Sequence, residues 1–466
     1  MLALTAADIA AAAGGRVIQG DAARAIGPIV IDSRSLAAGD FFIAIRGERF
    51  DGHDFVADAL DRGAIGVLVD RAVAARQAGG GLPVVIETAD TTAGLQGLAR
   101  DVRRRSGAKV VAITGSAGKT TTKEIAAEFL SARYEVFRNT GNLNNHIGLP
   151  LSLLELRSRP EVAVVELGMN HPGEIRTLVG VAEPDVRVWT NVGDAHLGFF
   201  ASADAIAGAK AEILEYARRD DVLIVNANDP RVMAFASAFT GRVVSFGTDV
   251  AADVAADHVE AGGLDGTRAS VMTRAGAARI HTPLLGLGNL SNVLAAIAVA
   301  IEFDVPLDDI VARAAALRPA RHRGELLRLP GGITLIDDSY NSSPAALKRA
   351  LETVKAATGS ARKVAVLGEM LELGSHASRL HEECGRVAAV TGLDLLIAVG
   401  GDPAAALARA AVDAGMPAHA VLLAGTSDEA ARLALERVRP GDLVLVKGSR
   451  GIATDRVVQR LTEEFA

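Results

Sequence analysis

The chain has 466 residues, of which 49% are hydrophobic and 23% are charged, and its formal net charge is −7. This length and composition predict a folded protein with roughly two to four domains. The negative charge excludes a general attraction to nucleic acid or anionic lipid, so local groups must hold any anionic ligand.

The cysteine count, the aromatic content and the apolar runs exclude further classes of protein. The single cysteine, Cys384, excludes an intramolecular disulfide framework and a cysteine-based zinc site, and is expected to be a small buried residue. Aromatic residues make up only 4% of the chain, which argues against base-stacking platforms. The N-terminus lacks a basic leader, and no run of about 18 apolar residues follows. We therefore expect a cytoplasmic protein that binds no nucleic acid and does not insert into a membrane.

Three blocks follow one another along the chain. Residues 1–106 have short strand-like runs between small helical segments, and the basic run Arg100–Arg105 is expected to be the solvated end of a helix. Apolar runs alternate with helical patterns in 107–322 and again in 323–466, which predicts parallel α/β sheets with ligands beyond the carboxyl ends of the strands. The polar segment Val250–His281 is expected to form peripheral strands of the middle block.

The stretch VVAITGSAGKTTTKE, which starts at Val110, changes from a β-branched run to helix-forming residues. The turn between them would aim backbone N–H groups and a helix dipole at one point, where phosphate can bind. Lys119 would reach the outer phosphates, and Thr120 would offer its hydroxyl to Mg²⁺. The run G-x-x-G-K-T is shorter than the standard nucleotide loop, so a plain strand-to-helix connection is the alternative. GTP-type switching is disfavoured, because no N-K-x-D stretch follows.

Further candidates lie where predicted strands end. Glu166 ends an apolar strand, where a carboxylate must be solvated, paired or bound to a cation such as Mg²⁺. His196 lies in the loop after the next strand, although a lone histidine is usually structural. Lys210 lies in a helical pattern, where a lysine ordinarily belongs to a solvated face.

Two groups of asparagines have two interpretations each. The loop TGNLNNHIG contains Asn142, Asn144 and Asn145, which either build their own turns or bind an oxygen-rich substrate such as a sugar. Asn289 and Asn292 precede an Ala/Val/Leu helix, so they could simply be polar caps at its start.

In the third block, the loop IDDSYNSSP follows one strand and KGSRG follows another. If both loops face one crevice, their acidic and basic groups would suit a zwitterionic ligand. The residues concerned are Asp338, Tyr340, Asn341, Lys447 and Arg450.

These motifs, taken in order, resemble the Mur ligases of bacterial cell-wall synthesis. Each motif alone is weak, but the whole ordered set is specific to the family. The resemblance covers nearly the whole chain and rests on the following motifs: DSRSLAAGDFFIAIRGERFDGHDF, TGSAGKTTTKE, NTGNLNNHIGLPL, ELGMNHPGEI, NVGDAHLGFF, AKAEIL, IDDSYNSSP, VLGEMLELG and VLVKGSR.

The resemblance implies three domains: a small α/β UDP-sugar domain at 1–106, a central P-loop ATPase with a parallel sheet at 107–322, and a Rossmann-like domain at 323–466 that closes over ATP and the incoming amine. A monomer is expected. It further implies metal ligands, namely Thr120, Glu166, His196 and Lys210, the last if carbamylated. Lys119, Glu166, His196 and Lys210 would form the catalytic set.

The resemblance also implies contacts for each substrate. ATP would be bound by Gly115, Ser116, Ala117, Gly118, Lys119, Thr120, Thr121, Asn289, Asn292, Arg323 and Asp338. UDP-N-acetylmuramoyl-tripeptide would be bound by Ser33, Arg34, Asn142, Asn144 and Asn145. D-Alanyl-D-alanine would lie near Tyr340, Asn341, Lys447 and Arg450.

Two positions depart from the family pattern. Where the family reads G-x-H-N-x-x-N, the chain has Gly288 in place of the histidine, so any adenine contact from that imidazole is lost. Where the family reads G-R-G-E, the chain has His322 in place of a hinge glycine, followed by the expected Arg323.

The implied reaction is ATP-dependent amide formation between D-alanyl-D-alanine and the tripeptide carboxylate through an acyl phosphate, with ATP and Mg²⁺ required. The alternative within the family is the preceding ligase, which adds the third, diamino acid residue. That enzyme would be expected to show D-N-P-R, which is absent here. A folylpolyglutamate-type ligase would not need the DSR-containing first block. A P-loop switch or a non-enzymatic nucleotide-binding module are the alternatives from other classes.

Overall fold

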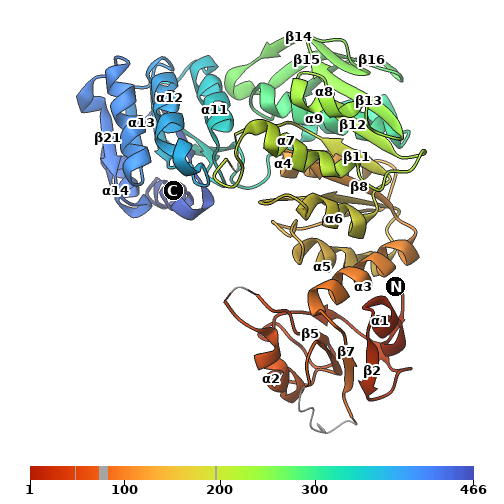
Figure 1. The fold of residues 1–466 in the computed structure, drawn as a ribbon. Helices are drawn as coiled ribbons and strands as arrows, with labels where there is room; N and C mark the ends of the chain where they lie inside the picture. Colours follow the sequence, from red (N-terminus) through yellow and green to blue (C-terminus); the bar gives the residue numbers. More distant parts are fainter. Residues whose placement is uncertain (48, 73–81, 195–196, 466) are drawn as a thin grey trace. The chain divides into compact units, whose positions relative to one another are not determined.

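The computed structural model describes residues 1–47, 49–72, 82–194 and 197–465 and has the α/β architecture that the sequence predicts (Figure 1). The chain divides into two compact units. The first comprises Met1–Ala112, Tyr134–Arg187 and Glu212–Asp221, and the second comprises Ile113–Arg133, Val188–Ala211 and Val222–Ala466. Within the described residues, no helix is long and apolar enough to cross a membrane.

The N-terminal part of the first unit contains a five-stranded sheet in the order β2-β7-β6-β5-β4. All neighbours in this sheet pair in parallel except β2 and β7. Apolar side chains such as Phe42, Val67 and Val85 are buried between the sheet and α2, which explains why these short runs form strands. The elements are β1 (Leu4–Thr5), α1 (Ala6–Ala12), β2 (Arg16–Gln19), β3 (Ala25–Ile26), β4 (Ile29–Val30), β5 (Phe41–Ile43), α2 (Val56–Asp61), β6 (Gly66–Val69) and β7 (Val84–Glu87).

A long helix, α3 (Thr91–Ser106), follows this sheet and ends at Gly107, whose φ of 75° is the left-handed conformation typical of a helix C-cap. The sequence suggested that the basic run at the end of this helix is solvated, but the structure shows that several of its arginines are paired. Arg103 is buried and donates to the carbonyl of Ala182 and to Asp185, while Arg100 and Arg104 both pair with Glu183. The arginines therefore connect α3 to the C-terminal end of α6 (Glu174–Ala182).

Replacing Glu183 with glutamine is expected to lower the free energy of unfolding by about 1–2 kcal/mol at pH 7, discounted for partial exposure. Hydrogen bonds from Arg104 and Arg100 lower the pKa of Glu183 to about 2 from 4.5. A lowered carboxyl pKa stabilises the fold above about pH 4.5, and this contribution is lost as the pH falls towards 2. Urea unfolding of E183Q and wild type from pH 7 to pH 3 measures the difference.

The control for this experiment is Glu135→Gln, which changes an exposed glutamate in the same unit. It should leave stability within about 0.5 kcal/mol of wild type. A destabilisation by E183Q that stayed constant as the pH fell below 4 would contradict a role for the ionised carboxylate.

The central sheet has nine strands in the order β16-β15-β14-β13-β12-β11-β8-β10-β9. β13 runs parallel to β12 and β14, whereas β14, β15 and β16 pair antiparallel, in agreement with the expectation of peripheral strands between Val250 and His281. The elements are β8 (Lys109–Thr114), α4 (Lys119–Leu130), β9 (Val136–Arg138), α5 (Gly148–Leu154), β10 (Val162–Glu166), β11 (Val186–Trp189), α7 (Ala203–Lys210), β12 (Val222–Asn226), α8 (Pro230–Ala236), β13 (Arg242–Thr248), β14 (Val254–Ala261), β15 (Thr267–Thr273), β16 (Gly276–Thr282), α9 (Gly286–Glu302) and α10 (Leu307–Ala316).

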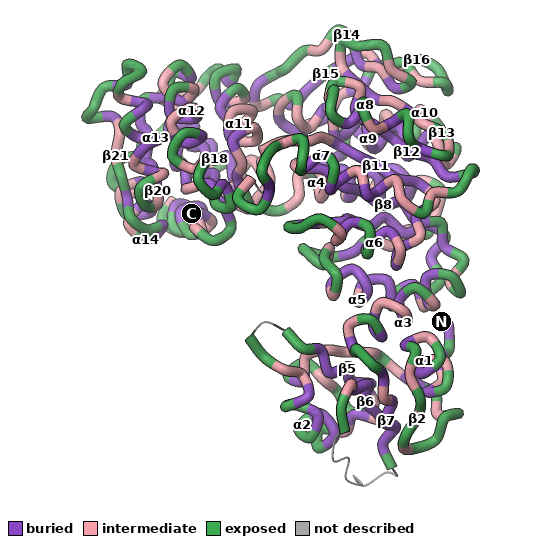
Figure 2. Tube along the Cα trace, in the orientation of Figure 1, coloured by how far each residue is buried: buried purple, intermediate pink, exposed green. Residues whose placement is uncertain are grey.

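The inner strands of this sheet are buried along nearly their whole length, and so is most of α9, as the purple segments of Figure 2 show. Continuous burial explains why the sequences of these strands are apolar throughout and do not alternate between apolar and polar residues. It also leaves the loops after the strands as the places where polar side chains can gather.

The third sheet has the order β17-β18-β22-β19-β20-β21, and only β17 is antiparallel to its neighbour. Successive residues of β19 point to opposite faces: Ala365 and Leu367 pack towards α11, α12 and α13, whereas Val364 and Val366 pack towards α14 and α15. The elements are β17 (Glu325–Leu329), β18 (Ile333–Asp338), α11 (Pro344–Ala356), β19 (Arg362–Gly368), α12 (Ala377–Ala389), β20 (Leu395–Val399), α13 (Asp402–Asp413), β21 (Val421–Ala424), α14 (Ser427–Arg437), β22 (Asp442–Lys447) and α15 (Asp455–Glu464).

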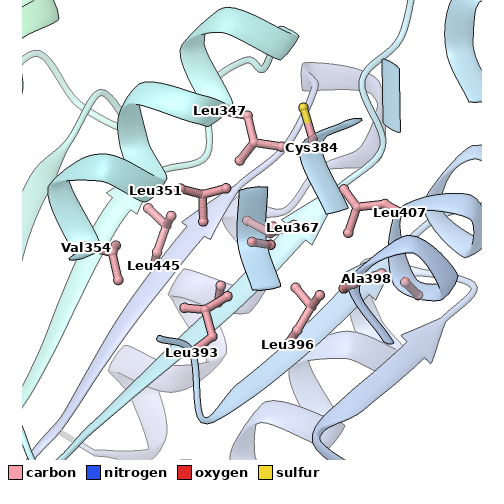
Figure 3. Close-up of a cluster of buried hydrophobic side chains, with 14 of the residues drawn as sticks. Leu347, Leu351, Val354, Leu367, Cys384, Leu393, Leu396, Ala398, Leu407 and Leu445 are labelled. Carbon is pink, nitrogen blue, oxygen red and sulfur yellow. The ribbon is translucent and has the colours of Figure 1, made fainter. Parts of the chain in front are cut away.

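Figure 3 shows Cys384 within one of these cores, beside Leu347 and other aliphatic side chains. The expectation of a buried cysteine is therefore confirmed. Burial raises the pKa of its thiol to about 12, so the group stays protonated and unreactive at neutral pH.

Candidate active site

The glycine loop predicted between β8 and α4 is closely packed against the residues around it. Gly115 and Gly118 have φ values of 149° and 83°, in the region that favours glycine. A Cβ atom on Gly115 would lie 1.9 Å from Oγ1 of Thr190, and one on Gly118 would lie 2.1 Å from Oδ1 of Asn292. Because α4 begins at Lys119, its first unpaired N–H groups and the positive end of its dipole lie at this loop.

Two residues at the end of β11 hold the loop in place. Asn191 accepts a hydrogen bond from the Ala117 N–H and donates one to the Ala117 carbonyl, both at 2.9 Å. Thr190 donates to the same carbonyl at 2.8 Å. Ser116 donates to the carbonyl of Gly193 and accepts from its N–H. We assigned no role to Thr190 or Asn191 from the sequence, although their position directly after a predicted strand could have identified them.

Lys119 and Arg323 bring positive charge to this loop. Lys119 Nζ donates to the carbonyl of Gly115 at 3.0 Å, and Arg323 Nη2 donates to the Thr120 hydroxyl at 3.1 Å. The Arg323 guanidinium also lies 4.2 Å from the centroid of the Tyr340 ring, a cation–π contact. Two residues separated by about 200 positions, Thr120 and Arg323, thus meet where phosphate is expected to bind.

Asn289 and Asn292 lie inside α9 and do not cap it, so the interpretation as polar caps was wrong. The helix begins at Gly286, and its N-cap, Leu285, makes no side-chain cap. Asn289 donates to the Leu285 carbonyl at 2.9 Å. Asn292 accepts from the Thr122 hydroxyl at 3.3 Å, so this asparagine links α9 to α4 beside the glycine loop.

Glu166 ends β10 with only 3% of its surface exposed, as expected for a carboxylate at the end of a buried strand. Asn144 donates to its Oε1 at 2.8 Å, and the Glu166 N–H donates to Oδ1 of Asn139 at 3.2 Å. Asn144 therefore orients the carboxylate, a role that the sequence did not suggest for it. Asn139 was missed altogether.

The other two asparagines of this loop differ from Asn144. Asn145 accepts from the N–H groups of Ile147 and Gly148, so it builds the turn into α5, which is one of the two uses the sequence left open. Asn142 is exposed.

Ser33 and Arg34 lie in the loop after β4. Ser33 is buried, whereas the side chain of Arg34 is 86% exposed and pairs with Asp32. Hydrogen bonds from Arg34 lower the pKa of Asp32 to about 2, so the pair stays ionised at neutral pH. The loop thus presents a guanidinium to the surface.

Lys210 is the last residue of α7 and is 1% exposed, so the interpretation as a solvated helix face was wrong. Burial of a lysine side chain is costly unless its charge is compensated or removed. His196, the other candidate after β11, lies outside the described residues.

In the third block, Lys447 and Asp338 meet. Lys447 Nζ lies 2.7 Å from Asp338 Oδ2 and donates to the carbonyl of Asn341 at 3.0 Å. Arg450 does not join this cluster: its exposed side chain pairs with Asp455.

His322 shows how the chain tolerates a side chain at a glycine position of the family pattern. Its φ is 62°, which is rare for a residue other than glycine. Nδ1 lies 2.7 Å from Oδ2 of the buried Asp337, and the His322 carbonyl accepts from the Tyr340 N–H. These contacts hold the residue immediately before Arg323.

The glycine loop between a buried strand and a helix, with Lys119 and Arg323 beside it, defines a P-loop nucleotide-binding protein of the α/β class. Family models match in three successive stretches: "Mur ligase family, catalytic domain" at 25–102, "Mur ligase middle domain" at 113–300 and "Mur ligase, glutamate ligase domain" at 322–450. The chain belongs to the Mur ligase family.

Three similar proteins have related names. A UDP-N-acetylmuramoyl-tripeptide–D-alanyl-D-alanine ligase of Bacillus subtilis is 34% identical, with 93% of each chain covered. The crystal structure of MurF from Acinetobacter baumannii matches with a TM-score of 0.90 and 32% identity, covering 99% of each chain. MurF ligase from Thermotoga maritima, in complex with ADP, matches with a TM-score of 0.82 and 29% identity over 94% of this chain and 97% of that one.

Proposed function

We propose that this protein is the ATP-dependent ligase that joins D-alanyl-D-alanine to UDP-N-acetylmuramoyl-tripeptide, giving the UDP-pentapeptide for peptidoglycan, ADP and phosphate. The observation that carries this proposal is the 34% identity to a ligase of that name over 93% of each chain. The sequence also lacks the D-N-P-R stretch expected of the preceding ligase. The protein acts as a monomer in the cytoplasm.

The reaction needs two displacements. A free carboxylate is a poor electrophile because its leaving group would be oxide. A carboxylate oxygen of the tripeptide therefore attacks the γ-phosphorus of ATP, the bond from that phosphorus to the ADP oxygen breaks, and an acyl phosphate forms. The amine nitrogen of D-alanyl-D-alanine then attacks the acyl carbon, phosphate leaves with the C–O electron pair, and the nitrogen loses a proton. All the phosphate-bearing species are anionic, so catalysis rests on positioning and charge compensation.

The chain's own groups suit these tasks. Lys119 and Arg323 lie at the glycine loop and would compensate charge on the phosphates of ATP. The remaining nucleotide contacts would come from residues 115–121, Asn289, Asn292 and Asp338. Ser33, Arg34, Asn142, Asn144 and Asn145 would bind the UDP-muramoyl side. Tyr340, Asn341, Lys447 and Arg450 would bind D-alanyl-D-alanine in the domain at 323–466.

Mg²⁺ fits the donor chemistry. Glu166 supplies a buried carboxylate held by Asn144, and Thr120 supplies a hydroxyl, both of them hard oxygen ligands. We assign these two residues to the metal, together with His196, and with Lys210 if that lysine is carbamylated. When bound, Mg²⁺ would offset negative charge on the phosphates. Asn144 would keep the Glu166 carboxylate oriented for this role.

The test is phosphate release from ATP and Mg²⁺ by the purified protein with UDP-N-acetylmuramoyl-tripeptide, with and without D-alanyl-D-alanine. We expect sustained release only with both, and a UDP-pentapeptide by mass spectrometry. A parallel assay uses UDP-N-acetylmuramoyl-dipeptide with a diamino acid. Product in the parallel assay alone would identify the preceding ligase, and release that ignores every added substrate would identify a different ATPase.

A further inference from the structure

The side chain of Arg349 occupies the space beside Gly288. Gly288 lies in the first turn of α9, and Arg349 comes from α11. A Cβ atom built on Gly288 would lie 3.1 Å from both Cδ and Nε of Arg349. This is closer than ordinary van der Waals contact, so a larger residue at 288 would require Arg349 to move. The glycine at position 288 therefore leaves the space that the Arg349 side chain occupies.

The guanidinium of Arg349, a partly buried residue, is unpaired among the residues that the structure describes. Across residues 1–47, 49–72, 82–194 and 197–465, it forms no hydrogen bond or ion pair. Burial lowers its pKa, and the negative charges of Glu352 and Asp338 only partly offset this effect. A guanidinium has five N–H donors and a flat face, and leaving it partly desolvated without a partner has a free-energy cost. A bound ligand with acceptors or an aromatic ring would remove this cost.

The position of Arg349 indicates which part of a ligand it would meet. Asn292 lies against Gly118 of the glycine loop, and Gly288 is four residues earlier in the same helix. Four residues span about 6 Å of an α-helix, so Arg349 lies roughly one helical turn away from the phosphate loop. The nucleoside is the part of a nucleotide that extends beyond its phosphates.

We propose that Arg349 binds the nucleoside part of ATP, with its guanidinium plane against the base. Arginine suits this task because its planar cation stacks on aromatic faces and donates hydrogen bonds at its edge. Gly288 makes room for that side chain. The identity of the nucleotide as ATP rests on the proposed function, whereas the contact itself rests on the packing of α9 against α11.

The experiment measures binding of ADP and of inorganic tripolyphosphate to the full-length protein by calorimetry. We expect Arg349→Ala to weaken ADP binding about tenfold and to leave tripolyphosphate binding unchanged. Arg349→Lys should recover little, because lysine lacks the planar face. Lys355→Ala, an exposed lysine on the same helix, is the matched control and should bind ADP as wild type does. In turnover, Arg349→Ala should raise KM for ATP with little change in kcat.

Variants at both Gly288 and Arg349 give a second test. Gly288→His alone should weaken ADP binding, because its side chain collides with Arg349. Gly288→His combined with Arg349→Ala should recover ADP affinity relative to Arg349→Ala, because an imidazole then supplies an aromatic face in the same space. If Arg349→Ala alone fails to fold, the comparison of Gly288→His with wild type still tests whether the Arg349 side chain must stay in place for ADP to bind.

Three results would overturn the inference: ADP affinity within twofold of wild type in folded Arg349→Ala, an equal loss for tripolyphosphate, or no recovery in the double variant. A different result would contradict the proposed function. If wild type makes no UDP-pentapeptide but Arg349→Ala still loses ADP affinity, the contact stands and the assigned reaction does not.

Discussion

Replacing Lys119 with alanine is expected to lower kcat for UDP-pentapeptide formation by roughly a factor of 10³. The ammonium lies at the start of α4, within reach of the loop where the helix dipole and unpaired N–H groups converge. Charge on the transferring phosphoryl group spreads over its oxygens in the transition state, so the loss should affect kcat more than ADP binding. Mass spectrometry of the product and phosphate release measure the rate.

The fold should survive this change, because Lys119 is only partly buried. Its neighbour Lys123 is buried in α4 and would be a poor control. Lys109→Ala, an exposed lysine in β8, is the matched control, and it should keep nearly full activity. If Lys119→Ala retained more than a tenth of wild-type kcat with an unchanged unfolding midpoint, Lys119 would not be the phosphate-compensating group.

Replacing Lys210 with alanine is expected to lower activity at least about 100-fold, with partial recovery on adding a short-chain carboxylate. Lys210 is fully buried at the end of α7. For carbamylation the Lys210 ammonium first loses a proton, its Nζ nitrogen then bonds to the carbon of CO₂, and a second proton leaves, so that a cation becomes an anionic oxygen ligand. Truncation leaves space in which acetate or propionate can supply the missing carboxylate.

The rescue experiment has its own control. Lys210→Arg keeps a positive charge but cannot form the carbamate, so it should be inactive, and its larger side chain should prevent rescue by acetate. ¹³C NMR of wild type equilibrated with ¹³CO₂ should show a carbamate signal that Lys210→Ala lacks. Unchanged activity in Lys210→Ala would remove this lysine from the active site.

Much of the local structure could be predicted because its causes are local. The β-branched run before Gly115 and the helix formers after Lys119 placed the glycine loop correctly between a strand and a helix. Apolar runs that end in Gly, Asn or Asp identified the strands of both large sheets, and the weaker polar segment after Val250 was correctly expected at the edge. The short strands β9 and β17 were missed, because three to five half-buried residues give little periodic signal.

Two of the errors share one physical origin, which is burial by distant residues. The basic end of α3 was expected to be solvated, but Glu183 and Asp185 lie against it. Lys210 was expected on a solvated face and is buried. A helical pattern shows which residues share a face, but not what covers that face.

Short-range patterns were enough to predict α/β domains and a phosphate-binding loop, because periodicity and turn chemistry act between neighbours in the chain. The ordered motifs added the resemblance to a ligase family. The side chains that meet across long separations could be found only in the folded chain, such as Arg323 at Thr120, Lys447 at Asp338 and Arg349 at Gly288. These contacts depend on how whole helices and sheets pack, because packing, and not sequence spacing, sets the distances between their side chains.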